Sequence, residues 1–477
     1  MRSRIRKKDI PKLRVGVLHS QYGYPDGVSI VMSQVEHVMV DYMGIQKENV
    51  FYLAGKAKRK TENVFQQDIL WDMNRTNRIM LARFDKGFGG HYNEIIEKAI
   101  QKARIEIEKF IKKNKIDVLI AHNASLPVNF ISSIALSRYY RNAIRKGEKT
   151  PKYILWWHDG HTERKEYSNP APDVQEYLLE GVPGKHVEYI IFINSMQFSD
   201  AEKYFITLNK RKPGYHEMLE VNHDIVYNTT STFIESYEDL ESDKDLGHVN
   251  QFLSDFKVDE KIREKNLKLE DTQFVLQHTR IVPRKRIDFA IKYCYELLSK
   301  LKKKKMHKAM YFFISGHTGQ KSRQTRSALK RLNNKLAKKY GIDTFFLVFA
   351  EDYPNTKITF EEYPKIFAKL GGITTYFSEI EGFGNNLLEV LASGLVPIVY
   401  TYPVFKQDIA KFKFKVIALD KFEIDNESIK KTIDIIKNTR KRKIWVNRNL
   451  TILNKKFQHR IIQRKLTRAI IKKRPHI

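Results

Sequence analysis

The sequence predicts an α/β protein made of two doubly wound, Rossmann-like domains. Short apolar segments typical of buried strands alternate along the chain with longer helical patterns. Many of these segments end in glycine or polar residues, and open α/β sheets bind ligands at that edge. Hydrophobic periodicity fades and charge rises over residues 229–271, which separates two halves. We therefore expect a first domain over 1–228, a polar linker over 229–271, a second domain over 272–455 and a basic helix over 456–477.

In the first half, residues next to the expected strands are the first site candidates. Gly27 precedes an amphipathic helix, and glycine there permits close approach of a ligand, although a plain turn glycine is the commoner role. His122 and His158 each follow an apolar strand and would lie at the ligand-binding rim of the sheet. A histidine bonded to a neighbouring carbonyl group is the structural alternative for His122. The expected strands are 13–18, 116–121, 153–157, 189–193 and 224–228.

The second half contains the most informative stretch of the chain, residues 374–400. It reads as a strand, a glycine turn at Gly382-Phe383-Gly384, a helix from Asn385 and a second strand. A glycine turn that begins a helix after a parallel strand presents backbone N–H groups to a phosphate. For Glu381 and Glu389, a solvated helix face is the alternative, since Glu favours helices. The expected strands are 274–278, 310–315, 345–349, 374–377, 396–400 and 416–419.

The stretch from Glu381 to Glu389 resembles the E-x7-E motif of retaining GT-B glycosyltransferases, of which glycosyltransferase family 4 is the large example. The resemblance covers nearly the whole chain, although its specific motifs lie between residues 274 and 403. It implies a GT-B fold whose two domains hold a nucleotide sugar in a central cleft. The implied reaction moves the sugar, with retention, to an acceptor that the sequence does not identify: a glycan, a lipid-linked acceptor or a phosphate-rich polymer.

A second segment carries the same resemblance. Arg280 and Lys285 stand on the two cation positions of the family's G-R-x-x-x-x-K-G loop. Thr279 and Arg286 depart from it, because glycine is usual at both positions, so we expect a tighter or more cationic loop. A solvated basic surface is the alternative in so basic a chain.

The resemblance also assigns roles to individual residues. Arg280 and Lys285 would stabilise the departing nucleoside diphosphate, on which negative charge builds up as the glycosidic bond breaks. Glu381 would bind hydroxyls of the transferred sugar, and Glu389 would bind the ribose. His122 would lie beside the sugar. The remaining residues expected at the nucleotide sugar are Gly27, His158, Gly382, Phe383, Gly384 and Asn385.

No metal or other cofactor is expected. His158 and His161 lack an evident third ligand, and the D-x-D triplet at Asp243 lies in the polar run without a preceding strand. The resemblance implies a front-face displacement in which the departing diphosphate takes the acceptor's proton. It also implies that the basic helix at 456–477 packs back on the first domain.

Composition adds one open question. With 477 residues, 42% of them hydrophobic, the chain is long and apolar enough for buried cores. The net charge of +31 has three explanations: an anionic membrane surface, a compositional bias spread over all surfaces and, as the least favoured, nucleic acid. The single cysteine, Cys294, excludes an intramolecular disulfide, and no apolar run is long enough to span a membrane. We expect a cytoplasmic protein, with peripheral binding at the inner membrane face as an alternative.

Two other functional classes remain open. One is a different enzyme on the same fold: a sugar-nucleotide epimerase, a hydrolase, or a transferase that glycosylates a nucleic-acid base. The other is a non-catalytic protein that binds a polyanion through its basic surface. The four charged motif residues argue against the second class, because a binding module has no need of all of them.

Overall fold

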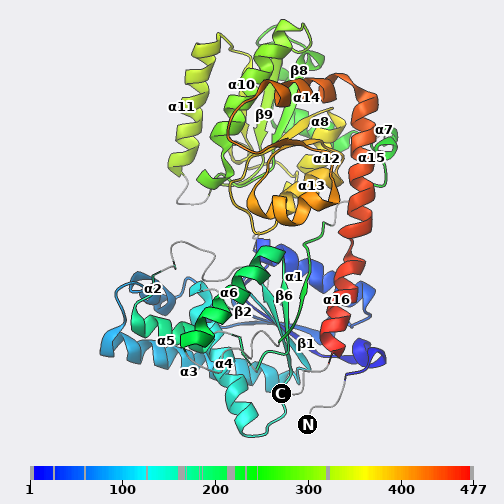
Figure 1. Cartoon of the computed structure of the whole chain (residues 1–477). Helices are drawn as coiled ribbons and strands as arrows, with labels where there is room; N and C mark the ends of the chain where they lie inside the picture. Colours follow the sequence, from blue (N-terminus) through cyan, green and yellow to red (C-terminus); the bar gives the residue numbers. More distant parts are fainter. Residues whose placement is uncertain are drawn as a thin grey trace. The chain divides into compact units, whose positions relative to one another are not determined.

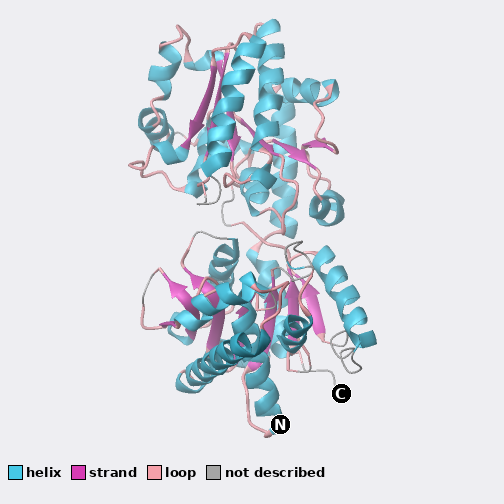
Figure 2. Ribbon diagram, turned by 90° about the vertical axis from the view of Figure 1, so that its left-hand side faces the viewer, coloured by secondary structure: helices cyan, strands magenta, loops and turns pink. Residues whose placement is uncertain are grey.

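The computed structural model describes residues 5–472, apart from 25–26, 59–60, 125–126, 159–166, 168, 182, 185, 212–220, 231–233, 244 and 319–322. The chain forms two compact units. Unit 1 runs to Thr229 and also includes the segment from His459 onward, and unit 2 spans Thr230–Gln458. In each unit the strands lie between layers of helices (Figure 2).

Unit 1 is built on a parallel sheet with the strand order β3-β2-β1-β4-β5-β6-β7. The chain moves outward from β1 to β3 and then crosses to β4 on the other side of β1. The connections after β1 and β4 therefore diverge, and this switch point is where such sheets bind ligands. The strands are β1 Val15–Tyr22, β2 Val50–Ala57, β3 Val64–Gln66, β4 Val118–His122, β5 Lys152–Trp157, β6 Tyr189–Phe192 and β7 Asn222–Ile225.

The helices of unit 1 cover both faces of this sheet. Helices α3, α4 and α5 pack side by side and contribute buried residues such as Ile107 and Ile131 to the core (Figure 1). Helix α16, from the end of the chain, packs against β5, β7 and the short helix Val38–Tyr42. The helices are α1 Gly27–His37, α2 Arg75–Ala82, α3 Gly89–Lys113, α4 Phe130–Arg145, α5 Pro172–Gly181, α6 Ser195–Arg211 and α16 His459–Ile471.

Unit 2 has the same design with the strand order β10-β9-β8-β11-β12-β13, again all parallel. Its switch point lies between β8 and β11, which pair directly. The strands are β8 Thr272–Gln277, β9 Ala309–Ile314, β10 Phe345–Phe349, β11 Ile373–Tyr376, β12 Pro397–Tyr400 and β13 Ile417–Leu419. The helices are α7 Tyr237–Ser242, α8 Gly247–Asp255, α9 Val258–Arg263, α10 Ile287–Lys303, α11 Arg323–Tyr340, α12 Tyr363–Lys369, α13 Asn385–Ala392, α14 Asn426–Lys437 and α15 Thr439–Lys456.

The segment 229–271 is not a linker, contrary to the expectation from sequence. It folds into α7, α8 and α9, and these helices belong to unit 2. Phe252 and Phe256 are fully buried, and Phe252 packs against the rings of Phe313 and Phe367. The aliphatic side chains of Val258 and Ile262 are buried beside these rings, so a few apolar residues anchor a largely polar run.

The two parallel α/β units confirm the predicted fold class. The strands expected in the second half are found within a few residues of their predicted bounds. The sequence analysis missed β2, the neighbour of β1, and the short β3. Residues 50–55, the first part of β2, are all buried. This apolar run could have predicted the strand from the sequence.

Candidate active site

The carboxyl ends of β8 and β11 bring together the two segments that the sequence analysis singled out. The basic loop after β8 contains Arg280 and Lys285, and the turn after β11 contains Glu381. Because β8 and β11 are adjacent parallel strands at the switch point, residues about a hundred positions apart in sequence lie side by side.

Lys285 and Glu381 form a nearly buried ion pair, with side chains 7% and 9% exposed. The Lys285 ammonium group donates to Glu381 Oε1 and lies 5.7 Å from the centre of the Tyr376 ring. The Tyr376 hydroxyl donates to the same carboxylate oxygen over 3.1 Å, and Arg284 donates to Oε2 over 3.2 Å. Each oxygen of the Glu381 carboxylate therefore has a partner.

These contacts determine the charge states. Burial alone would raise the pKa of Glu381, but the charges of Lys285 and Arg284 outweigh it and lower the pKa to about 2. Burial lowers the pKa of Lys285, with further lowering from Arg284 and Arg280, while Glu381 opposes the shift. Glu381 is thus a carboxylate at any physiological pH.

Arg280 differs from Lys285 in its surroundings. It is exposed, and its side chain makes no hydrogen bond or ion pair with the part of the chain that the structure describes. It lies close enough to Lys285 to lower the pKa of that ammonium group. An uncompensated guanidinium beside a second cation is a site for an anion.

The glycine turn fits its space tightly. Gly384 has a φ of 113°, and a Cβ there would stand 2.3 Å from the Tyr402 hydroxyl oxygen. That hydroxyl donates to the carbonyl oxygen of Phe383 over 2.8 Å. Gly382 is exposed beside it, and α13 begins at Asn385, so the positive end of the α13 dipole lies at this turn.

Glu389 lies one and a half turns of α13 above the glycine turn and is bonded to a residue that the sequence analysis did not select. Its Oε2 lies 3.1 Å from Nε2 of His278, whose Nδ1 lies 2.9 Å from the Ser315 hydroxyl. His278 is fully buried and stacks on Phe360 at 4.0 Å between ring centres. The sequence could have indicated His278 as a site residue, because it directly follows the last residue of strand β8.

A cavity of about 930 Å³ opens next to this chain of contacts, at the carboxyl ends of β9 and β10. Aromatic rings of Tyr353, Phe360 and Tyr363 line it, together with Ser315 and the cations Arg326 and Lys330. Gly316 allows the loop at its edge to approach Thr279, because a Cβ would stand 2.1 Å from the Thr279 carbonyl oxygen. Polar side chains such as His317, Thr318 and Glu351 line the rest of it, so the cavity offers both aromatic rings and polar groups to a small molecule.

The predicted histidines form a separate cluster in unit 1. His122 ends β4, and its Nδ1 lies 2.9 Å from Nε2 of His158 at the end of β5. His19 of β1 reaches the carbonyl oxygen of His122 through its Nδ1 at 3.1 Å. Burial and the neighbouring rings lower the pKa of His122 well below its usual value, and burial lowers that of His158 to about 3. The pair is therefore neutral at physiological pH.

Gly27 also belongs to unit 1, at the first position of α1. No heavy atom lies within 4 Å of a Cβ built there, so packing inside the protein does not require glycine.

A metal site finds no support in the part of the chain that the structure describes. No group of three or more His, Cys, Asp or Glu side chains there could hold a metal ion. Asp243 is bound by Lys365 and Lys369, each at 2.9 Å. His161 lies outside the described residues. None of the helices in the described ranges is long and apolar enough to cross a membrane.

Comparisons with known proteins agree with this geometry. Residues 258–450 match the family model of the glycosyl transferases group 1. The chain is 25% identical over 438 residues to mannosylglucosylglycerate synthase of Petrotoga mobilis, with 85% of this chain and 86% of that protein covered. The solved structure of trehalose-6-phosphate synthase OtsA is similar at a TM-score of 0.60 and 10% identity, over 96% of this chain and 98% of that one. The structure of HepE of Anabaena in complex with UDP and glucose is similar at a TM-score of 0.54 and 10% identity. The match covers 95% of this chain and 98% of that one.

These similarities define the class of protein. The fold is GT-B, with two Rossmann-like α/β domains, as the sequence predicted. Unit 2 carries a glycosyltransferase group 1 domain, and the chain is a glycosyltransferase.

Proposed function

We propose that the protein transfers a sugar from a nucleoside-diphosphate sugar, with retention at the anomeric carbon, as a member of glycosyltransferase family 4. The observation that carries this proposal is the site between β8 and β11, where the cations Arg280 and Lys285 lie beside the carboxylate of Glu381. Two cations suit a diphosphate, and a carboxylate suits sugar hydroxyls. HepE, a protein of similar fold, binds UDP and glucose, which supports a nucleotide sugar here.

Arg280 and Lys285 act on the leaving group. Negative charge develops on the diphosphate as the bond to the sugar breaks, and fixed cations lower the barrier by stabilising that charge. The guanidinium group of Arg280 can bind the diphosphate without breaking another contact, since no carboxylate pairs with it in the part of the chain that the structure describes. Lys285 must exchange its bond to Glu381 for a bond to phosphate, and Arg284 and Tyr376 then remain on the Glu381 carboxylate.

The carboxylates orient the substrate. Glu381 stays ionised because its pKa is about 2, so it accepts hydrogen bonds from sugar hydroxyls throughout the physiological pH range. Glu389 accepts the ribose hydroxyls, and His278 holds its Oε2 in place. The neighbouring cavity of about 930 Å³, with its aromatic walls, receives the nucleoside.

The reaction proceeds on one face of the sugar and without a metal. The bond from the anomeric carbon to the diphosphate oxygen breaks, the bond to the acceptor oxygen forms on the same face, and the acceptor proton passes to the departing diphosphate. The cations of the site take the place of a metal ion at the phosphates. EDTA is therefore expected to leave turnover unchanged.

The acceptors to test first are small sugar acids. The relative from Petrotoga mobilis is a synthase whose product carries a glycerate group, and the strongly basic character of this chain suits an anionic acceptor. We also propose a cytoplasmic location, supported by the single cysteine.

A screen of nucleotide binding tests the proposal. Purified protein is titrated with UDP, GDP, ADP and CMP and their glucose conjugates where these exist, and binding is read as a rise in melting temperature. One nucleoside diphosphate is expected to stabilise the protein. Arg280→Ala should abolish this stabilisation and lower turnover about a hundredfold. Lys302 is an exposed lysine near the end of α10, and Lys302→Ala is the matched control. This variant should keep the nucleotide stabilisation and the turnover of wild type. Stabilisation by DNA or anionic lipid, with none from any nucleotide, would contradict the proposal.

A further inference from the structure

Arg286 stands where the family pattern has glycine, and its backbone keeps the conformation that glycine favours. Its φ is 47° and its ψ is 44°, in the left-handed region that is costly for side chains with a Cβ. Arg286 is also the residue that joins the basic loop to α10. Because this backbone conformation costs free energy in arginine, we expect contacts of the Arg286 side chain to offset that cost.

The side chain of Arg286 is fully engaged. Its guanidinium group donates to both carboxylate oxygens of Asp288, over 3.1 and 3.2 Å, and to Oε1 of Glu379 over 2.9 Å. The same group lies 4.4 Å from the centre of the Phe422 ring. Arg286 is therefore not an extra phosphate ligand, and the loop is less cationic than its sequence suggests.

The bond to Glu379 links the two loops of the site. Glu379 lies on the turn after β11, two residues before Glu381, and Arg286 directly follows Lys285. A second link runs in parallel, since the backbone N–H of Glu379 donates to the carbonyl oxygen of Arg284 over 2.9 Å. Arg284 also donates to the carbonyl oxygen of Ile380. The loops that carry Lys285 and Glu381 are thus fastened together by contacts other than the ion pair itself.

We propose that Arg286 is a positioning residue for sugar transfer, which acts by holding the basic loop against the turn at Glu379. This inference rests on the proposed function, because it concerns the placement of Lys285 at the leaving group and of Glu381 at the sugar. An error of about 1 Å in such a placement costs on the order of a hundredfold in rate. The arginine fork fits this role better than a lysine, since it reaches two carboxylates at once.

Arg286→Gly is the most informative variant. It permits the left-handed backbone without strain and removes only the side-chain bonds, so the unfolding temperature without ligand should stay close to that of wild type. We expect the release of UDP from UDP-glucose to fall tenfold to a hundredfold in kcat, and hydrogen exchange at the Glu379 amide to speed up. Arg286→Lys should recover part of the loss.

Matched variants separate the two bonds of Arg286. Glu379→Gln weakens the link between the loops and should resemble Arg286→Gly, whereas Asp288→Asn weakens only the local pair and should stay near wild-type turnover. The double variant Arg286→Gly with Glu379→Gln should be no worse than Arg286→Gly alone.

The outcomes distinguish this inference from the proposed function. If wild type binds and turns over UDP-glucose and Arg286→Gly has the same kcat, the positioning role is wrong while the function stands. The same conclusion follows if Asp288→Asn loses as much turnover as Glu379→Gln. If wild type binds none of UDP, GDP and ADP and none of their sugar conjugates, the proposed function fails and the inference fails with it.

Discussion

At the scale of single residues, the site depends on a buried ion pair whose members have different tasks. Lys285 and Glu381 neutralise each other in the protein without ligand. In the function proposed above, both are needed, apart from each other, when a nucleotide sugar is bound. A nucleotide sugar offers a partner to each of them. A nucleoside diphosphate offers one only to Lys285, so on this proposal we expect the ion pair to favour binding of the intact substrate over the product.

Glu381→Gln tests the ion pair through stability. The variant leaves Lys285 buried without its anion, which should lower the free energy of unfolding at neutral pH by about 3 kcal/mol. The pKa of Glu381 is lowered on folding, from 4.5 to about 2, so its contribution is fully present above pH 4.5 and disappears as the pH falls toward 2.

Urea unfolding at pH 7 and at pH 3 measures this difference. The gap between wild type and Glu381→Gln should be wide at pH 7 and narrower at pH 3. An equal gap at both values would mean that Glu381 is not held as a low-pKa carboxylate.

Sequence reasoning found the charged residues of the site but not their partners. Arg280, Lys285, Glu381 and Glu389 stand in patterns that short stretches of sequence reveal. His278 binds Glu389 across 111 positions, and Arg286 binds Glu379 across 93. Such pairs are formed by the adjacency of β8 and β11, which no local pattern encodes.

At the scale of elements, the start of α13 is the most constrained part of the site. Gly384 combines a left-handed backbone with direct contact to the Tyr402 hydroxyl. Neither a side chain nor a different backbone conformation fits there without moving the turn that carries Glu381.

Gly384→Ala should lower the free energy of unfolding by about 2–4 kcal/mol, because a Cβ adds both backbone strain and overlap with Tyr402. Thermal unfolding measures the effect. Gly27→Ala is the control, since no heavy atom lies within 4 Å of its added Cβ, and it should change stability by less than about 1 kcal/mol. Equal effects in the two variants would contradict this account of the turn.

Most elements were predictable from sequence, and the exceptions have a physical explanation. The buried parallel strands of unit 2 read as continuous apolar runs, so β8 to β13 were found. Helix α8 was missed because its buried side is made of Val249 and Phe252 only, in an otherwise polar segment. Two residues are too few for a periodic pattern, although the aromatic one fills the core.

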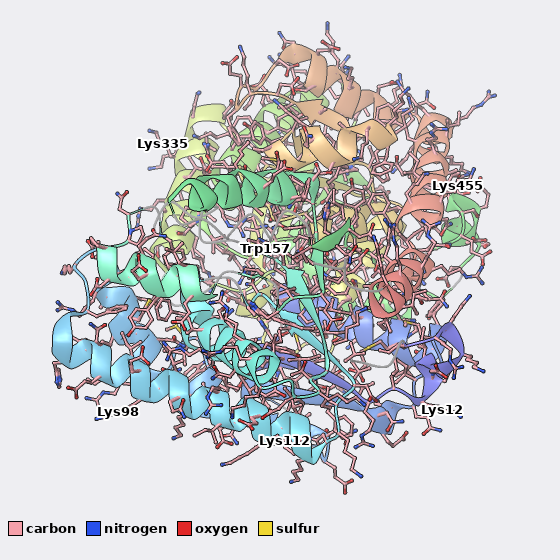
Figure 3. All side chains as sticks on the ribbon, turned by 60° about the horizontal axis from the view of Figure 1, so that its bottom comes forward. Lys12, Lys98, Lys112, Trp157, Lys335 and Lys455 are labelled. Atoms are coloured by element: carbon pink, nitrogen blue, oxygen red, sulfur yellow. The ribbon has the colours of Figure 1, made fainter. Side chains whose placement is uncertain are left out.

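At the scale of the whole molecule, both units carry exposed lysines. Lys98 and Lys112 project from α3 of unit 1, while Lys335 and Lys455 project from α11 and α15 of unit 2 (Figure 3). Two of these lysines pair with neighbouring glutamates: Lys98 with Glu94 at 3.9 Å and Lys112 with Glu108 at 2.6 Å. Exposed lysines on both units fit a compositional bias.

The segment from His459 completes unit 1, and its removal tests that role. The buried side chains of α16 include Ile462 and Leu466, and Lys465 binds Asp224 of β7. A chain ending at Gln458 should therefore lose the thermal transition of unit 1 and be cleaved rapidly there by protease, while unit 2 stays resistant. A chain ending at Lys472 keeps α16 and should behave like wild type. Full resistance of the shorter chain would show that unit 1 is stable without α16.

The position of α16 also determines the order in which the protein matures during synthesis. The ribosome makes β1 to β7 first, but the helix that covers β5 and β7 emerges only after all of unit 2. Unit 2 is continuous in sequence and can fold as it leaves the ribosome, whereas unit 1 must wait with part of its apolar surface uncovered. The half of the enzyme that is made first is thus the half that is finished last.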